Sequence, residues 1–109
     1  MTLAELTYRL AAALPASERY ELSSQIRRAS VSIPSNIAEG YARESEASYV
    51  HFLKIARGSL RELETQALLG TRLMLVDAAI AEPVLVQCDR VGKLLYGLIR
   101  SLDEEGVAR

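Results

Sequence analysis

The most constraining feature of the sequence is an apolar repeat between residues 49 and 70, in which the steps alternate between four and three residues. Its members are Tyr49, Leu53, Ala56, Leu60, Leu63, Ala67 and Gly70. This spacing keeps one face of an α-helix apolar for three heptads and is typical of helices that pack lengthwise against other helices. Strict alternation of apolar and polar residues, which a half-buried strand needs, never persists along the chain. The repeat therefore predicts an all-α protein.

Helical spacing of apolar residues recurs in three further segments. We predict four helices, at about residues 3–13, 17–41, 45–73 and 78–103. Thr2 and Glu5 form a capping-box pattern before the first helix, and Ser17 and Ser45 are the expected N-caps of the second and third.

The fourth helix has two candidate starting points, because Pro83 fits poorly inside a helix. The helix begins either near Glu82, after an irregular turn, or at Ala78, with a kink at the proline. The acidic residues 103–105 and Gly106 are expected to end it, since acidic side chains oppose the dipole at a helix C-terminus.

The 109 residues are enough for one domain, which we expect to span residues 1–109. Connections of about 3–6 residues favour antiparallel neighbours, hence an up-down-up-down four-helix bundle. The first helix is about half as long as the third, so we expect part of the apolar repeat to lack a partner within the chain. Leaving a Leu or Ile exposed costs about 1.5–3 kcal/mol, and self-association into a homo-oligomer would recover that free energy.

Composition excludes several classes of protein. A formal charge of -1 argues against an overall basic nucleic-acid binder, although it allows a local basic patch. A single cysteine rules out an internal disulfide and a thiol-based metal site. The longest stretch without a charged residue, residues 29–38, is far shorter than the roughly 20 residues that span a bilayer. The N-terminus does not resemble a signal peptide, so we expect a cytoplasmic protein without a membrane segment.

A polar segment within residues 25–43 is not explained by packing alone. Its core is the string Ser32, Pro34, Asn36, Glu39 and Gly40. One interpretation is a packing and interface motif, in which the Asn and Glu bond within the bundle and the glycine permits close approach or a left-handed cap. The other is a ligand site at a helix end. A phosphate loop is excluded, because the G-x-x-x-x-G-K pattern is absent.

Three blocks of sequence carry a resemblance to a known family. They read SSQIRRASVSIPSNIAEGYAR, FLKIARGSLRELETQ and LLYGLIRSL. Together with their spacing over residues 14–102, they resemble the four-helix-bundle proteins also called 23S rRNA-intervening-sequence proteins. The first helix is shorter here than is usual in that family.

The resemblance implies an assembly and leaves the activity open. It implies a closed ring of identical subunits, a homopentamer. The chain is also similar to the accessory proteins of diversity-generating retroelements, pentamers that associate with a reverse transcriptase and nucleic acid. RNA, DNA or a nucleic-acid enzyme are therefore the partners that the resemblance suggests.

A local excess of basic residues is the chain's one nucleic-acid signal. The candidate contacts are Arg27, Arg28, Arg43, Arg57 and Arg61. Arg57 and Arg61 lie one helical turn apart and can present two guanidinium groups to successive phosphates. The alternative is that these arginines pair with glutamates of the same or a neighbouring subunit, among them Glu39, Glu62 and Glu64.

No catalytic, cofactor or metal site can be assembled from the remaining residues. His51 is the only histidine, so it cannot supply the paired Glu-x-x-His motifs of a di-iron bundle. Cys88 falls on the apolar stripe of the fourth helix and is expected to be a small core residue. We predict a non-enzymatic, homo-oligomeric protein associated with nucleic acid. The alternative is a structural module that docks a protein and binds no nucleic acid.

Overall fold

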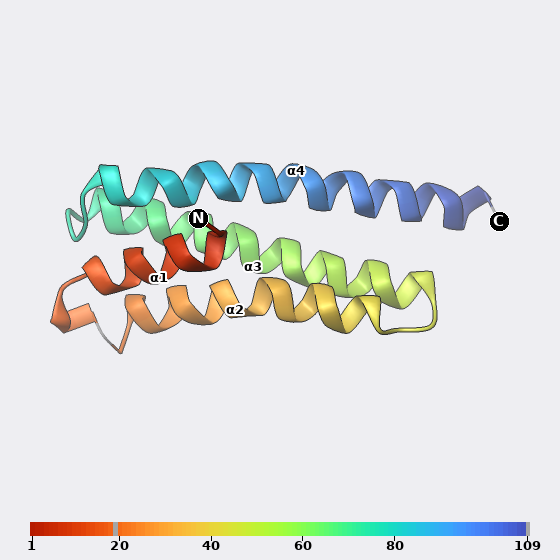
Figure 1. The fold of residues 1–109 in the computed structure, drawn as a ribbon, viewed down its shortest axis with the longest axis horizontal. Coiled ribbons are helices and arrows are strands. Elements are labelled where there is room, and N and C mark those ends of the chain that lie inside the picture. Colours follow the sequence, from red (N-terminus) through yellow and green to blue (C-terminus); the bar gives the residue numbers. More distant parts are fainter. Residues whose placement is uncertain (19, 109) are drawn as a thin grey trace.

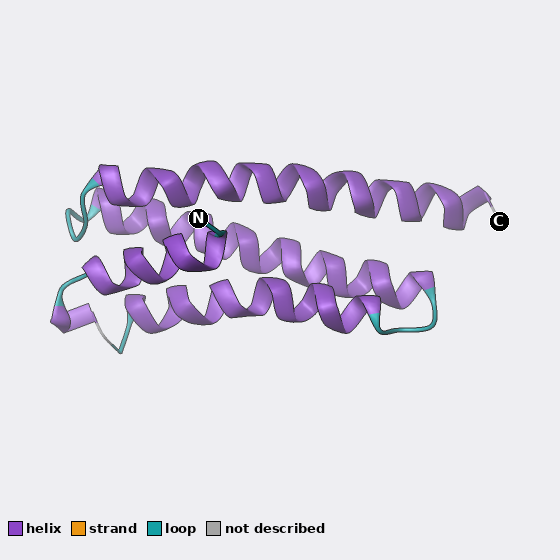
Figure 2. Cartoon of the chain, in the orientation of Figure 1, coloured by secondary structure: helices purple, strands orange, loops and turns teal. Residues whose placement is uncertain are grey.

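Every regular element in the described part of the chain is helical (Figure 2). The computed structural model describes the backbone of residues 1–18 and 20–108, and the side chains of these residues as far as residue 103. The elements are α1 (Leu3–Ala13), a short 3-10 helix η1 (Ala16–Glu18), α2 (Leu22–Tyr41), α3 (Glu46–Arg72) and α4 (Ala78–Ala108). The prediction of an all-α protein with four helices is confirmed.

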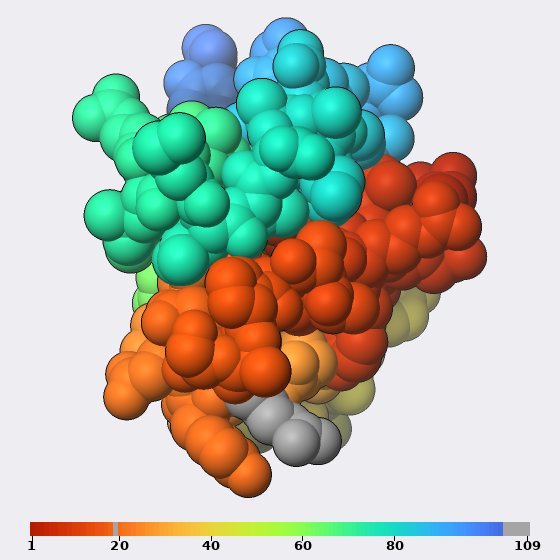
Figure 3. Space-filling model, turned by 90° about the vertical axis from the view of Figure 1, so that its left-hand side faces the viewer, coloured from red at the N-terminus to blue at the C-terminus, as the bar shows by residue number. Residues whose placement is uncertain are grey.

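The helices lie along one long axis and form an elongated body with extents of 51 × 22 × 22 Å (Figure 1). Packing is mainly between α1 and α2, α2 and α3, α3 and α4, and α4 and α1. The α2–α3 connection lies at one end of the molecule. The α1–α2 and α3–α4 connections lie at the other end, where Figure 3 shows them side by side. The short α1 reaches only from this end to about the middle.

The apolar repeat of α3 forms the centre of the core. Leu53, Ala56, Leu60, Leu63 and Ala67 are all 1% exposed or less. The expectation that part of this repeat lacks a partner within the chain is therefore wrong. Figure 1 gives the reason, because α2 and α4 flank α3 along most of its length. The short α1 instead leaves the far halves of α2 and α4 without its cover.

The first helix has the predicted bounds, and local hydrogen bonds define its start. The hydroxyl of Thr2 accepts from the backbone N–H of Glu5 at 3.2 Å, and the Glu5 carboxylate accepts from the Thr2 N–H at 3.1 Å. This is the predicted capping box. At the other end, the Ser23 hydroxyl donates to the Ala11 carbonyl at 3.1 Å and joins α1 to α2 inside the core.

The second helix begins later than predicted. Ser17 lies in η1 and does not cap α2, which starts at Leu22 after Glu21, a residue with no side-chain capping bond. The physical reason is the reversal of the chain. Leu14 and Leu22 are both buried, so the chain turns between them. The described part of this turn includes the bond from the Glu18 N–H to the Pro15 carbonyl at 2.9 Å.

The third and fourth helices differ from the prediction only near their ends. Ser45 caps α3, since its hydroxyl accepts from the Ser48 N–H at 3.1 Å. Of the two starts considered for α4, the structure has Ala78, with Pro83 inside the helix. The predicted end at residue 103 is too early, because the helix continues through Gly106 to residue 108. A glycine stops a helix readily where it adopts a positive φ, and no glycine in the described chain does so.

Candidate functional site

The Ser32–Gly40 string lies on α2, and part of it forms a polar network with α3. The hydroxyls of Ser32 and Ser59 lie 2.7 Å apart. The Asn36 side-chain amide donates to the Ser32 carbonyl at 2.8 Å and to the Ser32 hydroxyl at 2.9 Å. This network fixes the register of the two helices, because a polar group at a packed seam is costly to leave without a partner.

Gly40 allows the closest approach between these helices. A Cβ atom at this position would lie 2.8 Å from the Phe52 Cβ and 3.2 Å from the Tyr49 carbonyl oxygen. Its φ is not positive, so of the two roles expected for this glycine the structure shows close approach and not a left-handed cap. Any larger residue would force the end of α2 away from the start of α3.

Pro34 and Glu39 make no contact with this network. Pro34 is exposed inside α2 and, lacking an N–H, leaves the Ser30 carbonyl without its usual helical donor. The Ser30 hydroxyl is buried and has no hydrogen-bond partner among the described residues. Glu39 forms an exposed ion pair with Arg43, whose guanidinium lies 4.9 Å from the centre of the Phe52 ring.

The five candidate arginines do not converge on one surface. Arg43 is the member whose side chain has a partner. Within the described chain the guanidinium groups of Arg27, Arg28, Arg57 and Arg61 form no hydrogen bond or ion pair. The predicted pairing with Glu62 or Glu64 is therefore not seen within the chain.

Three of these arginines line hollows on the two sides of α3, and Arg61 borders both sides. Arg28 lines a hollow between α2 and α3, opposite Glu62. Arg57 and Arg61 line a shallow hollow of about 260 Å³ between α3 and α4, together with Lys93. Glu64 and Asp89 also line the second hollow, so its three basic side chains exceed its acidic ones by one.

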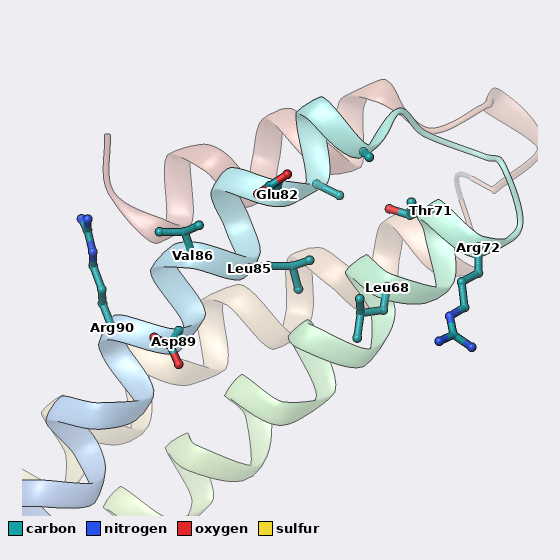
Figure 4. A pocket seen from close by; sticks show the side chains of 10 residues that line it. Leu68, Thr71, Arg72, Glu82, Leu85, Val86, Asp89 and Arg90 are labelled. Atoms are coloured by element: carbon teal, nitrogen blue, oxygen red, sulfur yellow. The ribbon is translucent and has the colours of Figure 1, made fainter.

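A third feature, an apolar groove between the end of α3 and the start of α4, was missed by the sequence reasoning (Figure 4). Its volume is about 560 Å³. Leu68 from α3 and Leu85 from α4 line it and point into the space between the helices, while Arg72 and Arg90 point away from it at its two ends. A groove of this size and composition suits an apolar side chain or helix from another molecule.

The sequence contains part of the information needed to predict this groove. Leu68 and Leu69 stand beside the heptad repeat as surplus apolar residues, and they are 47% and 44% exposed. The sequence does not state which neighbour faces them, since the opposite wall comes from α4. Only the packing of the two helices reveals that a concave surface results.

The one histidine and the one cysteine of the sequence lie on different helices, α3 and α4. His51 is exposed, and its ring lies edge-on to Phe52 with 5.4 Å between centroids. Cys88 is fully buried, and burial, with a smaller effect of Glu64, raises the pKa of its thiol to about 12. In the described residues, no three His, Cys, Asp or Glu side chains are grouped as metal ligands.

None of the described helices is long and apolar enough to span a bilayer.

These observations define an all-α protein of four packed helices, with hollows along its helix seams. The chain belongs to the family of 23S rRNA-intervening sequence proteins, whose family model matches residues 1–97. The match confirms the family resemblance given by the three sequence blocks.

A solved structure has the same fold. It is a protein of unknown function from the S23 ribosomal protein family of Bacteroides thetaiotaomicron. The two chains are 26% identical and superpose with a TM-score of 0.81, over 90% of this chain and 88% of the other. No curated protein matches the sequence.

Proposed function

We propose that this chain is a non-enzymatic subunit of a homo-oligomeric scaffold, folded as an antiparallel up-down-up-down four-helix bundle. The cyclic order of helix packing and the alternation of the connections between the two ends support this topology (Figure 1). Short connections between consecutive helices favour the same arrangement.

The observation that carries the assembly proposal is the exposed apolar surface, in which we distinguish two groups of residues. The first, the groove patch, surrounds the α3–α4 connection and comprises Leu68, Leu73, Met74, Ile80 and Val86. The second, the α4 ridge, comprises Leu94 and Leu98, which lie four residues apart on one face of the helix. Leu94 is 74% exposed in the middle of a long helix. Patches of this kind usually mark an interaction surface.

Two different patches support a head-to-tail contact in which the α4 ridge of one copy enters the groove of the next. Such a contact uses unlike surfaces, so it generates a ring when the rotation between copies closes. The family resemblance implies a ring of five. The shapes fit this contact, because Leu68 and Val86 line a concave groove and the α4 ridge projects from a single helix.

Two single substitutions test this assembly. Leu94→Asp disables the ridge and Leu68→Asp disables the groove. Val31→Asp is the control, since Val31 is an apolar residue on α2, outside both patches, that is about as exposed as Leu68. Sedimentation velocity at micromolar concentration should show a large assembly for the wild type and the control, and monomers for each of the other variants.

Mixing the two monomeric variants gives the decisive result. Each retains one intact patch, so a single head-to-tail contact is possible and the mixture should form dimers that cannot close. A mixture that stays monomeric would contradict the head-to-tail arrangement. A monomeric wild type would overturn the scaffold proposal itself.

We further propose that the scaffold associates with nucleic acid through Arg57 and Arg61. Support comes from the lack of an acidic partner for either guanidinium within the described chain, and from the repetition of the pair in every subunit. Labelled RNA should bind at low salt and weaken at physiological salt. The double variant Arg57→Glu, Arg61→Glu should bind at least about tenfold more weakly. Absence of binding at low salt would favour a module that docks only proteins.

A further inference from the structure

The seam between α2 and α3 contains a polar hollow of about 380 Å³ that the proposed scaffold does not use. Gln25, Arg28 and Ser32 line it from α2, and Ser59, Glu62 and Gln66 line it from α3. A concave site of this size, bounded by several convergent polar groups, is typical of small-ligand binding.

The hydroxyl groups at the floor of the hollow have hydrogen-bond partners within the chain, but the polar side chains at its walls do not. The Ser32 and Ser59 hydroxyls form a hydrogen bond with each other, and the Asn36 side-chain amide donates a second hydrogen bond to the Ser32 hydroxyl. By contrast, the side chains of Gln25, Arg28, Glu62 and Gln66 form no hydrogen bond or ion pair within the part of the chain that the structure describes. The side-chain oxygen of Gln66 is buried as well as unpartnered. Buried polar atoms normally have a partner, so this oxygen indicates a missing hydrogen-bond donor.

The wall groups specify what a ligand must present. Glu62 and the Gln66 oxygen accept hydrogen bonds, so the ligand needs adjacent donors on one edge. The Arg28 guanidinium only donates, so a neighbouring edge needs acceptors. Arg28 and Glu62 stand on different helices and do not form an ion pair with each other, which leaves both charges available.

Among the four common nucleobases, guanine meets both requirements at once. Its N1–H and N2–H₂ groups are adjacent donors that a carboxylate can accept, and its O6 and N7 atoms are acceptors that an arginine reads with two hydrogen bonds. Adenine and cytosine carry their two N–H donors on one amino nitrogen, and the ring nitrogen beside it is an acceptor. Uracil offers a single N–H between two acceptors. None of the three places donors on two adjacent atoms, which Glu62 and Gln66 together require.

The neighbouring surface has room for the sugar and phosphate. A second hollow of about 440 Å³ shares Gln25, Glu62 and Gln66 with the first and continues toward Gly58 and Arg61. No atom lies within 4 Å of the Cβ position at Gly58, so this floor is open. The Arg61 guanidinium stands on the same surface, where it can meet a phosphate.

We infer that the α2–α3 hollow binds a guanine base, held by Glu62 and Gln66 on one edge and by Arg28 on the other. The base can come from a single-stranded RNA or from a free guanine nucleotide. The RNA source rests on the nucleic-acid association proposed above, whereas the free nucleotide does not.

The experiment has two arms, each with the full-length protein in its native assembly state. In the first, guanosine and adenosine monophosphate are titrated by calorimetry. In the second, fluorescence anisotropy follows labelled oligouridine carrying one central guanosine or one central adenosine. We expect a preference for guanine of about tenfold in both arms, as one good bidentate contact provides.

Two glutamates on α3 provide matched variants. Glu62→Gln should remove the guanine preference, while Glu64→Gln, which lines the hollow on the opposite side of α3, should retain it. Both glutamates are at least partly exposed, so neither change threatens the fold.

The outcomes separate this inference from the proposed function. RNA binding without a guanine preference would overturn the guanine site and leave the phosphate contacts standing. Preference for guanosine monophosphate without RNA binding would support the site and remove the nucleic-acid role. Equal or absent binding of both mononucleotides, or an unaltered preference in Glu62→Gln, would overturn the inference.

Discussion

Gly40 and Gly58 are both glycines inside helices, and their surroundings are opposite. A Cβ at Gly40 would meet Phe52 and the Tyr49 backbone within about 3 Å, whereas the same atom at Gly58 would meet nothing within 4 Å. Gly40 is therefore required by the close approach of α2 and α3, while no packing contact requires Gly58, which lowers the helix propensity of α3.

The same substitution should thus have opposite effects at these two positions. Gly40→Ala should lower the free energy of unfolding by about 1–3 kcal/mol, because it overpacks a contact with backbone. Gly58→Ala should raise it by up to about 1 kcal/mol through helix propensity. Urea denaturation followed by circular dichroism measures both. A neutral effect at Gly40 would show that the helix ends separate at little cost.

Cys88 provides a pH-dependent contribution to stability whose sign follows from its burial. The fold raises the pKa of its thiol from 9.0 to about 12, so above pH 9 the unfolded chain loses a proton that the folded chain keeps. The unfolded state then binds fewer protons, and the stability contributed by the neutral thiol decreases as the pH rises from 9 toward 12.

Comparison with Cys88→Ala isolates this contribution from that of other titrating groups. Between about pH 8 and about pH 10.5, the wild type should lose stability faster than the variant, by at most about 1.4 kcal/mol per pH unit. Denaturant unfolding at several pH values provides the two curves. Parallel curves would mean that the thiol ionises as easily in the folded protein as in the unfolded chain.

At the scale of the elements, the end of α3 is closed by a turn with an unusual residue. The Leu75 N–H donates to the Gly70 carbonyl at 2.9 Å and the Met74 N–H to the Thr71 carbonyl at 3.0 Å, the bonding pattern of a Schellman motif. Met74 occupies its left-handed position with φ 59°, where glycine is usual. For an L-residue with a side chain, that conformation costs about 1–2 kcal/mol of free energy.

In the monomeric Leu94→Asp background, where the groove patch makes no contact between copies, Met74→Gly should therefore raise the free energy of unfolding by about 1 kcal/mol. The control is Leu73→Gly, because Leu73 precedes it with φ -82° and gains nothing from glycine's freedom. That variant should be less stable than the wild type by about 0.5–1 kcal/mol. Thermal unfolding at one protein concentration ranks the three proteins. The same sign for both variants would exclude backbone strain as the cause.

The helices were predictable because their signals are local. The heptad steps of residues 49–70 and the caps at Thr2 and Ser45 act within one or two turns, and the structure has them as predicted. The turn from Leu14 to Leu22 was not predictable in this way. Its length is set by the burial of two leucines against other helices, which overrides a serine that suits a cap.

The candidate sites were less predictable than the helices, because each arises between two elements. Periodicity places Leu68 beside the repeat of α3 but gives no information about Leu85 across the groove. In the same way, Arg28 and Glu62 are distant in sequence and share a hollow only after α2 packs on α3. The sequence indicates which single residues are candidates, but only the packing of the helices determines which residues face each other.

At the scale of the whole molecule, folding and assembly depend on different leucines. Leu60 is 1% exposed at the centre of the α3 repeat, whereas Leu94 is 74% exposed on the α4 ridge. The same change to aspartate places a charge in the core at one position and on the surface at the other. The two positions therefore separate the free energy of folding from that of association.

Leu60→Asp should lose more than about 4 kcal/mol of folding free energy, since it removes a buried leucine and buries a carboxylate without a partner. Helicity and assembly should then disappear together. Leu94→Asp should keep its helicity, yet its melting temperature should no longer rise with protein concentration, because only association makes stability concentration-dependent. Circular dichroism melts over a hundredfold concentration range compare them. If the wild-type melting temperature is already independent of concentration, the exposed leucines of α4 serve a partner other than a second copy of this chain.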